Sequence, residues 1–264
     1  MKVIARMIAR GNGSTLKRKN AYPILGKAML WRALTEAKQA NFIDDIFIWT
    51  EDEELSQITR DCGCHVIPRT REQVFYYGGF SDPNQWGSYM DEYIISKCGT
   101  LGDIRVSLNC NYCLMTGEIL DKMFVRLMED RTADTIIPVT KIDPYLFMKN
   151  PKTECLFPIW FHPGLDRQDY PQIYRAGGIS IKHAKRGIHN FGQRTLYHEL
   201  PPEYLIDIHN LEDVRLAEYY LMRRMGGKIV LPDDLETGES GTKIKMHLAG
   251  KSASEWTGNS THKG

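Results

Sequence analysis

The sequence has no long hydrophobic run and no excess of either charge. No stretch reaches the roughly 18 consecutive apolar residues that a membrane-spanning helix needs, and Arg6 and Arg10 interrupt the first apolar stretch, unlike a signal peptide. The 34 Lys and Arg residues balance 33 Asp and Glu residues, for a formal net charge of +1. Such a balance produces no overall field that would attract nucleic acid or an anionic membrane. We therefore expect a cytoplasmic protein with neither of these partners.

Metal-site and nucleotide-loop signatures are also scarce. The six cysteines occur as Cys62-x-Cys64, Cys98, Cys110-x-x-Cys113 and Cys155. No second CxxC motif or nearby histidine pair completes a zinc site, so we expect reduced and mostly buried thiols. The sequence GxxxxGK[ST] is absent as well, which excludes the usual P-loop for binding phosphates.

What the sequence does contain is an alternation of strand-like and helix-like segments. Short apolar runs predict strands over residues 3–9, 43–49, 65–68, 104–108, 135–139 and 177–181, and helical spacing predicts helices over residues 29–40, 53–62, 86–97, 117–128 and 211–224. This order predicts an α/β fold with a mostly parallel, doubly wound sheet, in one domain over about residues 1–230. Ligands of such sheets bind at the carboxyl ends of the strands.

Two segments depart from the alternation. Residues 143–173 are rich in aromatic residues and proline, which favours an extended arm that mediates oligomerisation, with a lid over the site as the alternative. Residues 231–264 are rich in Gly, Ser, Thr and Lys, so we expect a weakly ordered tail.

The loop over residues 10–20 carries the strongest chemical signal. It follows the first predicted strand directly, and it combines glycines with the cations Arg10, Lys17, Arg18 and Lys19. Free backbone N–H groups and several positive charges are what a triphosphate needs. The pattern alone fits a basic surface loop equally well.

Several motifs in register resemble the cytidylyltransferases that activate sialic acid and related nonulosonic acids. Ile8-Ala-Arg-Gly-Asn, Lys19-Asn20 and Pro23-Ile-Leu-Gly-Lys27 match the family's opening pattern IxARGGSKxIxxKNxxxLxGKPLI. Segments 43–54, 63–69, 165–181 and 201–213 resemble its later motifs in order, so that the similarity covers about residues 3–224. The loop at 13–16 also resembles the spore-coat polysaccharide cytidylyltransferases.

The resemblance implies a three-layer, Rossmann-like nucleotidyltransferase fold with a protruding dimerisation arm. It also implies transfer of CMP from CTP to an acidic sugar of the nonulosonic or sialic type, with release of pyrophosphate, for glycan biosynthesis. Mg²⁺ is the implied cofactor, CTP (or another NTP) and the acidic sugar are the implied partners, and a homodimer is the implied assembly.

The family's functional residues can be carried over to matching positions. The resemblance implies nucleotide binding by Arg10, Gly11, Asn12, Lys19, Asn20 and Asn109. It implies a catalytic role for Arg10, Lys19 and Asp207, with Asp207 as the ligand of the metal, and acceptor binding by Arg167, Gln168 and Tyr174.

Three departures from the family pattern leave alternatives open. Ser14 stands where the family has a lysine, whose charge Lys17 or Arg18 would then supply. His209 replaces the second metal-binding aspartate, for which Asp103 or Asp213 are the candidate substitutes. The family segment LQPTSPLR reads LNCNYCLM here, so base specificity is open. A non-catalytic nucleotide- or sugar-binding homologue, or an enzyme with altered base or acceptor specificity, remains the alternative.

Overall fold

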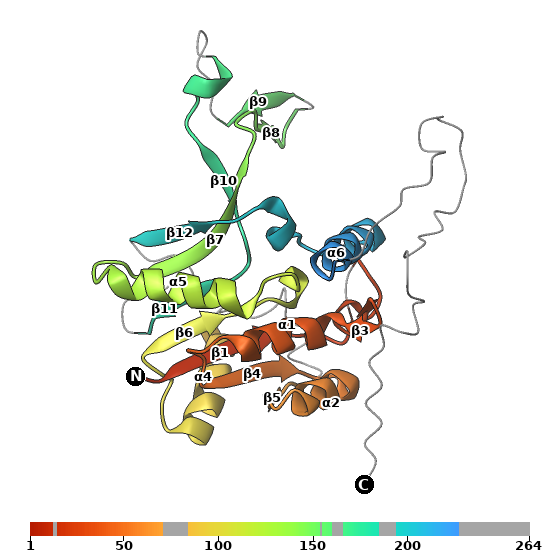
Figure 1. Ribbon diagram of the computed structural model, residues 1–264, viewed down its shortest axis with the longest axis vertical. Helices are drawn as coiled ribbons and strands as arrows, with labels where there is room; N and C mark the ends of the chain where they lie inside the picture. The colour runs from red at the N-terminus through yellow and green to blue at the C-terminus, as the bar shows by residue number, and fades with distance from the viewer. Residues whose placement is uncertain (13–14, 71–83, 154, 160–165, 185–193, 227–264) are drawn as a thin grey trace, which may run out of the picture.

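One eight-stranded sheet forms the centre of the molecule (Figure 1). The computed structural model describes the whole chain except residues 13–14, 71–83, 154, 160–165, 185–193 and 227–264. The strands pair in the order β10 (Ile173–Ala176), β7 (Thr135–Ile142), β11 (Ser180–His183), β6 (Ile104–Ser107), β1 (Val3–Ile8), β4 (Asp45–Thr50) and β5 (His65–Pro68), and β12 (Thr195–Glu199) pairs with β7. The predicted tail over residues 231–264 lies outside the described residues.

The sheet is mixed, and its largest part is parallel. Strands β6, β1, β4 and β5 run parallel to one another, as β12 does to β7. Strand β11 is antiparallel to both β6 and β7, and β10 is antiparallel to β7. The four residues from Ile46 to Trp49 in β4 are all buried, because a central strand covered on both faces has no solvent side. The predicted α/β fold is confirmed.

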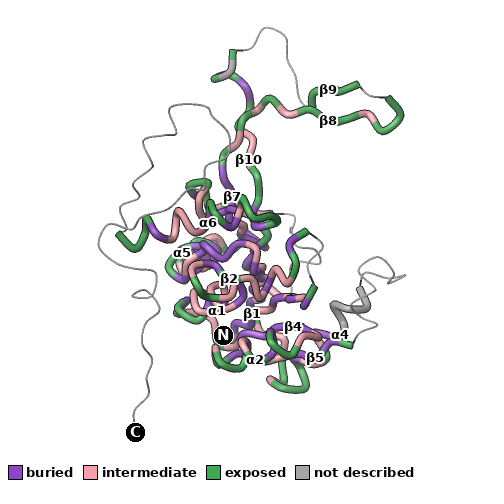
Figure 2. Tube along the Cα trace, turned by 90° about the vertical axis from the view of Figure 1, so that its right-hand side faces the viewer, coloured by how far each residue is buried: buried purple, intermediate pink, exposed green. Residues whose placement is uncertain are grey.

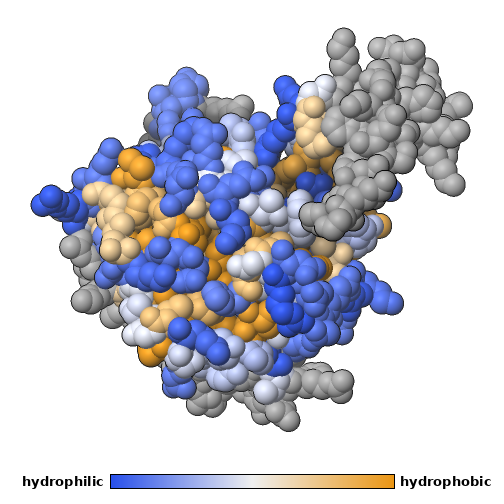
Figure 3. Space-filling model, turned by 60° about the horizontal axis from the view of Figure 1, so that its bottom comes forward, coloured by the Kyte–Doolittle hydropathy of each residue, from blue (hydrophilic) through white to orange (hydrophobic). Residues whose placement is uncertain are grey.

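Helices cover both faces of this sheet and make a three-layer arrangement. Helices α1 (Met29–Gln39), α2 (Glu53–Asp61), α5 (Gly117–Glu129) and α6 (Leu211–Arg224) share one core cluster with β1 and β6. On the opposite face, α4 (Asn84–Cys98) packs Met90 and Ile94 against Phe47 and Trp49. None of the helices in the described ranges is both long and apolar enough to cross a membrane. In the view of Figure 3, hydrophilic side chains surround a central apolar area, a mixture that is usual on globular proteins.

Three of the described helices, α2, α5 and α6, begin where a side chain accepts one of the first free backbone N–H groups. Asp52 caps α2 and Thr116 caps α5. Asn210 caps α6, and Asp213 completes a reciprocal capping box with it.

Gly117 lies where the first turn of α5 meets the last turn of α1. A Cβ atom at this position would lie 2.7 Å from the carbonyl oxygen of Glu36 and 2.8 Å from the backbone nitrogen of Ala40. We expect Gly117→Ala to lower the free energy of unfolding by about 1–3 kcal/mol, because two backbones cannot move apart without disturbing the core. Chemical denaturation would measure this, with Val125→Ala on the exposed face of α5 as the control. An unchanged or higher stability would show that the two helices separate at no cost.

Residues 143–173 leave the body of the molecule as an arm. Strand β7 continues into a small hairpin of β8 (Phe147–Lys149) and β9 (Leu156–Pro158), and the chain returns through β10. Figure 2 shows this segment standing away from the body, with most of its described residues exposed. Its large exposed side chains are Tyr145, Phe147, Met148, Leu156, Phe157 and Ile159.

Candidate functional site

The loop that follows β1 lies at the carboxyl edge of the sheet, and a hydrogen bond joins its two ends. The backbone N–H of Ala9 donates to the carbonyl oxygen of Trp49 in β4, which directs the chain into the loop beside that strand. Asn20 is 7% exposed, and its Nδ2 donates to the carbonyl oxygen of Arg10 at 2.8 Å. One buried amide therefore holds the backbone of Arg10 beside Asn20, the residue that follows Lys19.

Asn20 also connects this loop to the short 3-10 helix η3 (Cys110–Tyr112), which follows β6. Its Oδ1 accepts a hydrogen bond from the Sγ of Cys110 at 2.8 Å. Burial raises the pKa of the Cys110 thiol to about 12, so this thiol keeps its proton and acts as the donor. All six cysteines are free, but only Cys64, Cys110 and Cys113 are buried, whereas Cys62 and Cys98 are partly buried and Cys155 is exposed.

Asp207 lies on the other side of η3. Its Oδ1 accepts a hydrogen bond from Nδ2 of Asn111 at 2.9 Å, and its Oδ2 accepts one from the hydroxyl of Tyr112 at 3.1 Å. Burial and the charge of Asp207 raise the pKa of Tyr112 to about 12, so the phenol remains a donor. The Asp207 side chain is 33% exposed and its Oδ1 lies 3.0 Å from Nε2 of His209. The loop over residues 10–20 and the carboxylate of Asp207 thus both contact η3, the loop through Asn20.

The donor set around Asp207 fits Mg²⁺ only if the nucleotide completes it. Within the described residues, no group of three or more His, Cys, Asp and Glu side chains is arranged to hold a metal. Mg²⁺ often binds one or two carboxylates and takes its other ligands from substrate phosphates and water. Asp207, partly exposed beside the cationic loop, meets that requirement.

Two carboxylates that the sequence suggested as substitutes for the lost aspartate serve elsewhere. Asp103 precedes β6, so it lies at the amino end of the strand, and its Oδ2 accepts from the backbone N–H of Lys2. Asp213 accepts from the backbone N–H groups of His209 and Asn210 at the start of α6. Asp103 therefore lies at the edge of the sheet opposite to Asp207, and Oδ2 of Asp213 is used by the capping box of α6.

The sequence also suggested that Arg18 supplies the charge of the missing lysine. In the structure, the side chain of Arg18 points to acidic residues instead. The Arg18 guanidinium donates to both carboxylate oxygens of Asp52 at 3.1 Å, and to Glu54. Lys17 is exposed, like Asn12, whereas Gly11 is buried. The guanidinium of Arg18 is therefore committed to acidic side chains of the β4–α2 junction.

Asn109, the candidate nucleotide-binding residue that follows β6, is packed tightly. Its Oδ1 accepts from the backbone N–H of Asn111 at 3.0 Å and caps η3. A Cβ atom at Gly178 would lie 2.8 Å from Nδ2 of Asn109, so glycine is needed there for the close approach. This packing fixes the orientation of the amide at the end of β6.

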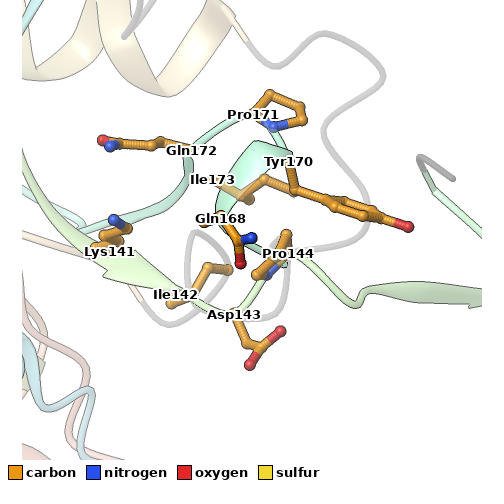
Figure 4. Close-up of a pocket in the computed structure, with 9 residues that line it drawn as sticks. All are labelled: Lys141, Ile142, Asp143, Pro144, Gln168, Tyr170, Pro171, Gln172 and Ile173. Atoms are coloured by element: carbon orange, nitrogen blue, oxygen red, sulfur yellow. The ribbon is translucent and has the colours of Figure 1, made fainter. Parts of the chain in front are cut away.

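The candidate acceptor residues are spread over the base of the arm. Gln168 lines a cavity of about 520 Å³ there (Figure 4). The other lining residues are Lys141, Ile142, Asp143, Pro144, Tyr170, Pro171, Gln172 and Ile173. The Tyr174 hydroxyl donates to Oε1 of Gln172, and its ring lies 5.3 Å from that of Tyr197. The side chain of Arg167 lies outside what the structure describes.

Sequence reasoning missed Arg175, which contacts the segment that leads to Asp207. Its Nη2 donates to the carbonyl oxygen of Leu205, two residues before Asp207, at 2.9 Å. Successive residues of a strand point to opposite faces, so Tyr174 and Arg175 cannot both face Asp207. No local pattern in the sequence marked Arg175, because the residues of β10 are half-buried or exposed and do not alternate between buried and exposed.

Comparisons with known proteins find similarity to cytidylyltransferases. The family described as Cytidylyltransferase matches residues 5–74, which include the cationic loop. The mitochondrial 3-deoxy-manno-octulosonate cytidylyltransferase of Arabidopsis thaliana is 24% identical over 90% of this chain and 82% of its own. The corresponding protein of Chlamydia trachomatis serovar L2 is 21% identical over 94% of both chains.

Solved structures confirm the fold over most of the chain. The CMP:2-keto-3-deoxy-manno-octonic acid synthetase complexed with CTP superimposes with a TM-score of 0.59 at 12% identity, over 85% of this chain and 100% of the other. A 4-diphosphocytidyl-2C-methyl-D-erythritol synthase from Anaerococcus prevotii gives a TM-score of 0.55 at 14% identity, over 84% and 99% of the two chains. The chain is thus similar to the cytidylyltransferase family model over residues 5–74, and to individual cytidylyltransferases over most of its length.

Proposed function

We propose that the protein transfers CMP from CTP to an acidic sugar and releases pyrophosphate. The observation that carries this proposal is the bridge from Asn20 through η3 to Asp207, which joins a cationic loop to a partly exposed carboxylate. Two relatives named as 3-deoxy-manno-octulosonate cytidylyltransferases support the sugar class. An acceptor of that type or of the related sialic type is therefore the first candidate.

The proposed reaction is a displacement at the α-phosphate. A sugar hydroxyl oxygen forms a new bond to the α-phosphorus, the bond from that phosphorus to the bridging oxygen of the β-phosphate breaks, and the hydroxyl proton passes to solvent. Arg10 and Lys19 bind the phosphates and neutralise their charge. Asp207 holds Mg²⁺, which when bound stabilises the charge on the leaving pyrophosphate.

The cavity at the base of the arm is the proposed acceptor site. It combines a cation, Lys141, with the amides of Gln168 and Gln172, which suit a sugar carboxylate and hydroxyl groups. Strand β10 leads from this cavity to Arg175, whose guanidinium contacts the segment before Asp207. An acceptor bound there would approach the nucleotide from the side of the arm.

Pyrophosphate release tests the proposal directly. The protein is incubated with Mg²⁺, with each of CTP, UTP, GTP and ATP, and with 3-deoxy-manno-octulosonate or sialic acid as acceptor. We expect release only with CTP and an acidic sugar. Release with another base would indicate altered specificity. Nucleotide binding without release for any acceptor would favour the non-catalytic alternative.

We also propose that the arm mediates a homodimer. Its exposed apolar side chains, including Phe147 and Leu156, form the kind of surface that a two-fold contact buries. Light scattering at micromolar concentration is expected to report a dimer, and Phe147→Glu is expected to shift it to a monomer. Lys152→Glu, an exposed change in the turn of the same hairpin, is the control and should remain dimeric. A monomeric parent protein would contradict the proposal.

A further inference from the structure

We propose that Glu51 and Asp52, at the carboxyl end of β4, are positioning residues that hold the two ends of the loop over residues 11–18 and so orient Arg10 and Lys19. This inference rests on the proposed nucleotide site, because it concerns how the cations of that site are held. Neither acid is expected to touch the nucleotide.

Glu51 holds the beginning of the loop. Its Oε1 accepts a hydrogen bond from the backbone N–H of Gly11 at 2.8 Å. Its Oε2 lies 3.9 Å from Nη1 of Arg69, whose side chain is 2% exposed and whose guanidinium lies over the Trp49 ring at 4.5 Å. A guanidinium stacked in the core offers little freedom of movement, so the carboxylate facing it is held at a defined place.

Asp52 holds the end of the loop. Both of its carboxylate oxygens accept hydrogen bonds from the Arg18 guanidinium at 3.1 Å, and Oδ1 also caps α2 by accepting from Leu55. Paired hydrogen bonds of this kind restrict orientation as well as distance. Arg18 has a φ of 52°, a left-handed conformation that a side-chain contact must stabilise in a residue other than glycine.

The position of these anchors along the chain is what links them to function. Gly11 directly follows Arg10, and Arg18 directly precedes Lys19. A Cβ atom at Gly11 would lie 2.5 Å from Oδ2 of Asp52, so the loop also packs directly on the second acid. Loss of the Glu51 contact or of the Asp52 contact therefore moves a phosphate-binding cation. A displacement of about 1 Å lowers the rate of a reaction that depends on alignment by about 100-fold.

The test compares variants that remove the anchor with variants that preserve its shape. Glu51→Ala removes the acceptor of the Gly11 N–H, whereas Glu51→Gln keeps an oxygen at the same place. Asp52→Asn keeps the helix cap and removes the charge that binds Arg18. Glu53→Gln is the matched control, because Glu53 is the next residue, is 84% exposed and pairs with Arg60 in the same helix.

Three quantities are measured for each variant: amide exchange of Gly11 by NMR without nucleotide, affinity for CTP, and the separate values of KM and kcat. We expect Glu51→Ala to accelerate exchange and to raise Kd and KM for CTP about tenfold, with a smaller change in kcat. Glu51→Gln should recover most of the affinity, Asp52→Asn should weaken CTP binding, and Glu53→Gln should match the parent.

The outcomes separate this inference from the proposed function. Unchanged Gly11 exchange in Glu51→Ala would overturn the anchoring, and faster exchange with unchanged CTP affinity would overturn the positioning role. Loss of thermal stability in Glu51→Ala with exchange and affinity as in the parent would overturn it as well. A parent protein that binds no nucleotide would instead refute the proposed function, whatever the exchange measurements show.

Discussion

Asp207→Asn is expected to reduce turnover by at least about 100-fold while changing the affinity for CTP by less than about threefold. The substitution keeps the shape of the side chain and its contact with Tyr112, but it removes the negative charge that would hold Mg²⁺. The metal acts mainly on charge that develops on the leaving pyrophosphate, and losses of about 10²–10³-fold are usual when one such stabilising group is removed. Pyrophosphate release and calorimetric titration of CTP would measure the two effects separately.

The matched control for this prediction is Asp213→Asn. Asp213 is six residues away, and its carboxylate accepts from the backbone N–H groups of His209 and Asn210. We expect this variant to lose about 1 kcal/mol of stability through the weaker helix cap and to keep its turnover. If Asp207→Asn stays within a few-fold of the parent, the metal is bound by other groups and the assignment of Asp207 fails.

Lys19→Ala is expected to weaken CTP binding by about 10- to 100-fold. Lys19 directly precedes Asn20, whose buried side-chain amide donates a hydrogen bond to the carbonyl oxygen of Arg10. A hydrogen bond between a cation and a phosphate contributes about 1.5–3 kcal/mol when it is partly shielded from water. Titration with CTP at low and high salt would measure the loss, which should be smaller at high salt because screening already weakens the contact in the parent.

The control for Lys19 lies two residues earlier in the chain. Lys17 is exposed in the same loop, so Lys17→Ala removes an equal charge from the same region. We expect it to change CTP affinity by less than about threefold, because the charge of an exposed side chain is screened by solvent; a larger loss would mean that Lys17 supplies the charge missing at Ser14. Equal losses in the two variants would mean that the loop acts only through its total charge, and unaltered binding in Lys19→Ala would remove the phosphate-site assignment.

The sequence predicted the parallel strands from β6 to β5 better than the strands β10 and β12, which flank β7. The buried runs in β1, β4 and β6 were identified to within two residues, because a strand covered on both faces carries a continuous apolar signal. Strands β10 and β12 were not predicted. Their residues are mostly half-buried or exposed, so periodicity alone does not distinguish them from loops.

The sequence by itself determined the features that depend on neighbouring residues: the α/β alternation, the cationic loop after β1, and the Asn210 cap of α6. Only the tertiary structure decided which distant groups meet. The hydrogen bond from Tyr112 to Asp207 joins residues that are 95 positions apart in the sequence. The hydrogen bonds from Gly11 to Glu51 and from Arg18 to Asp52 span 40 and 34 positions. Such pairs depend on which strand ends lie side by side, and a local pattern of apolar and polar residues specifies a strand without specifying its neighbour.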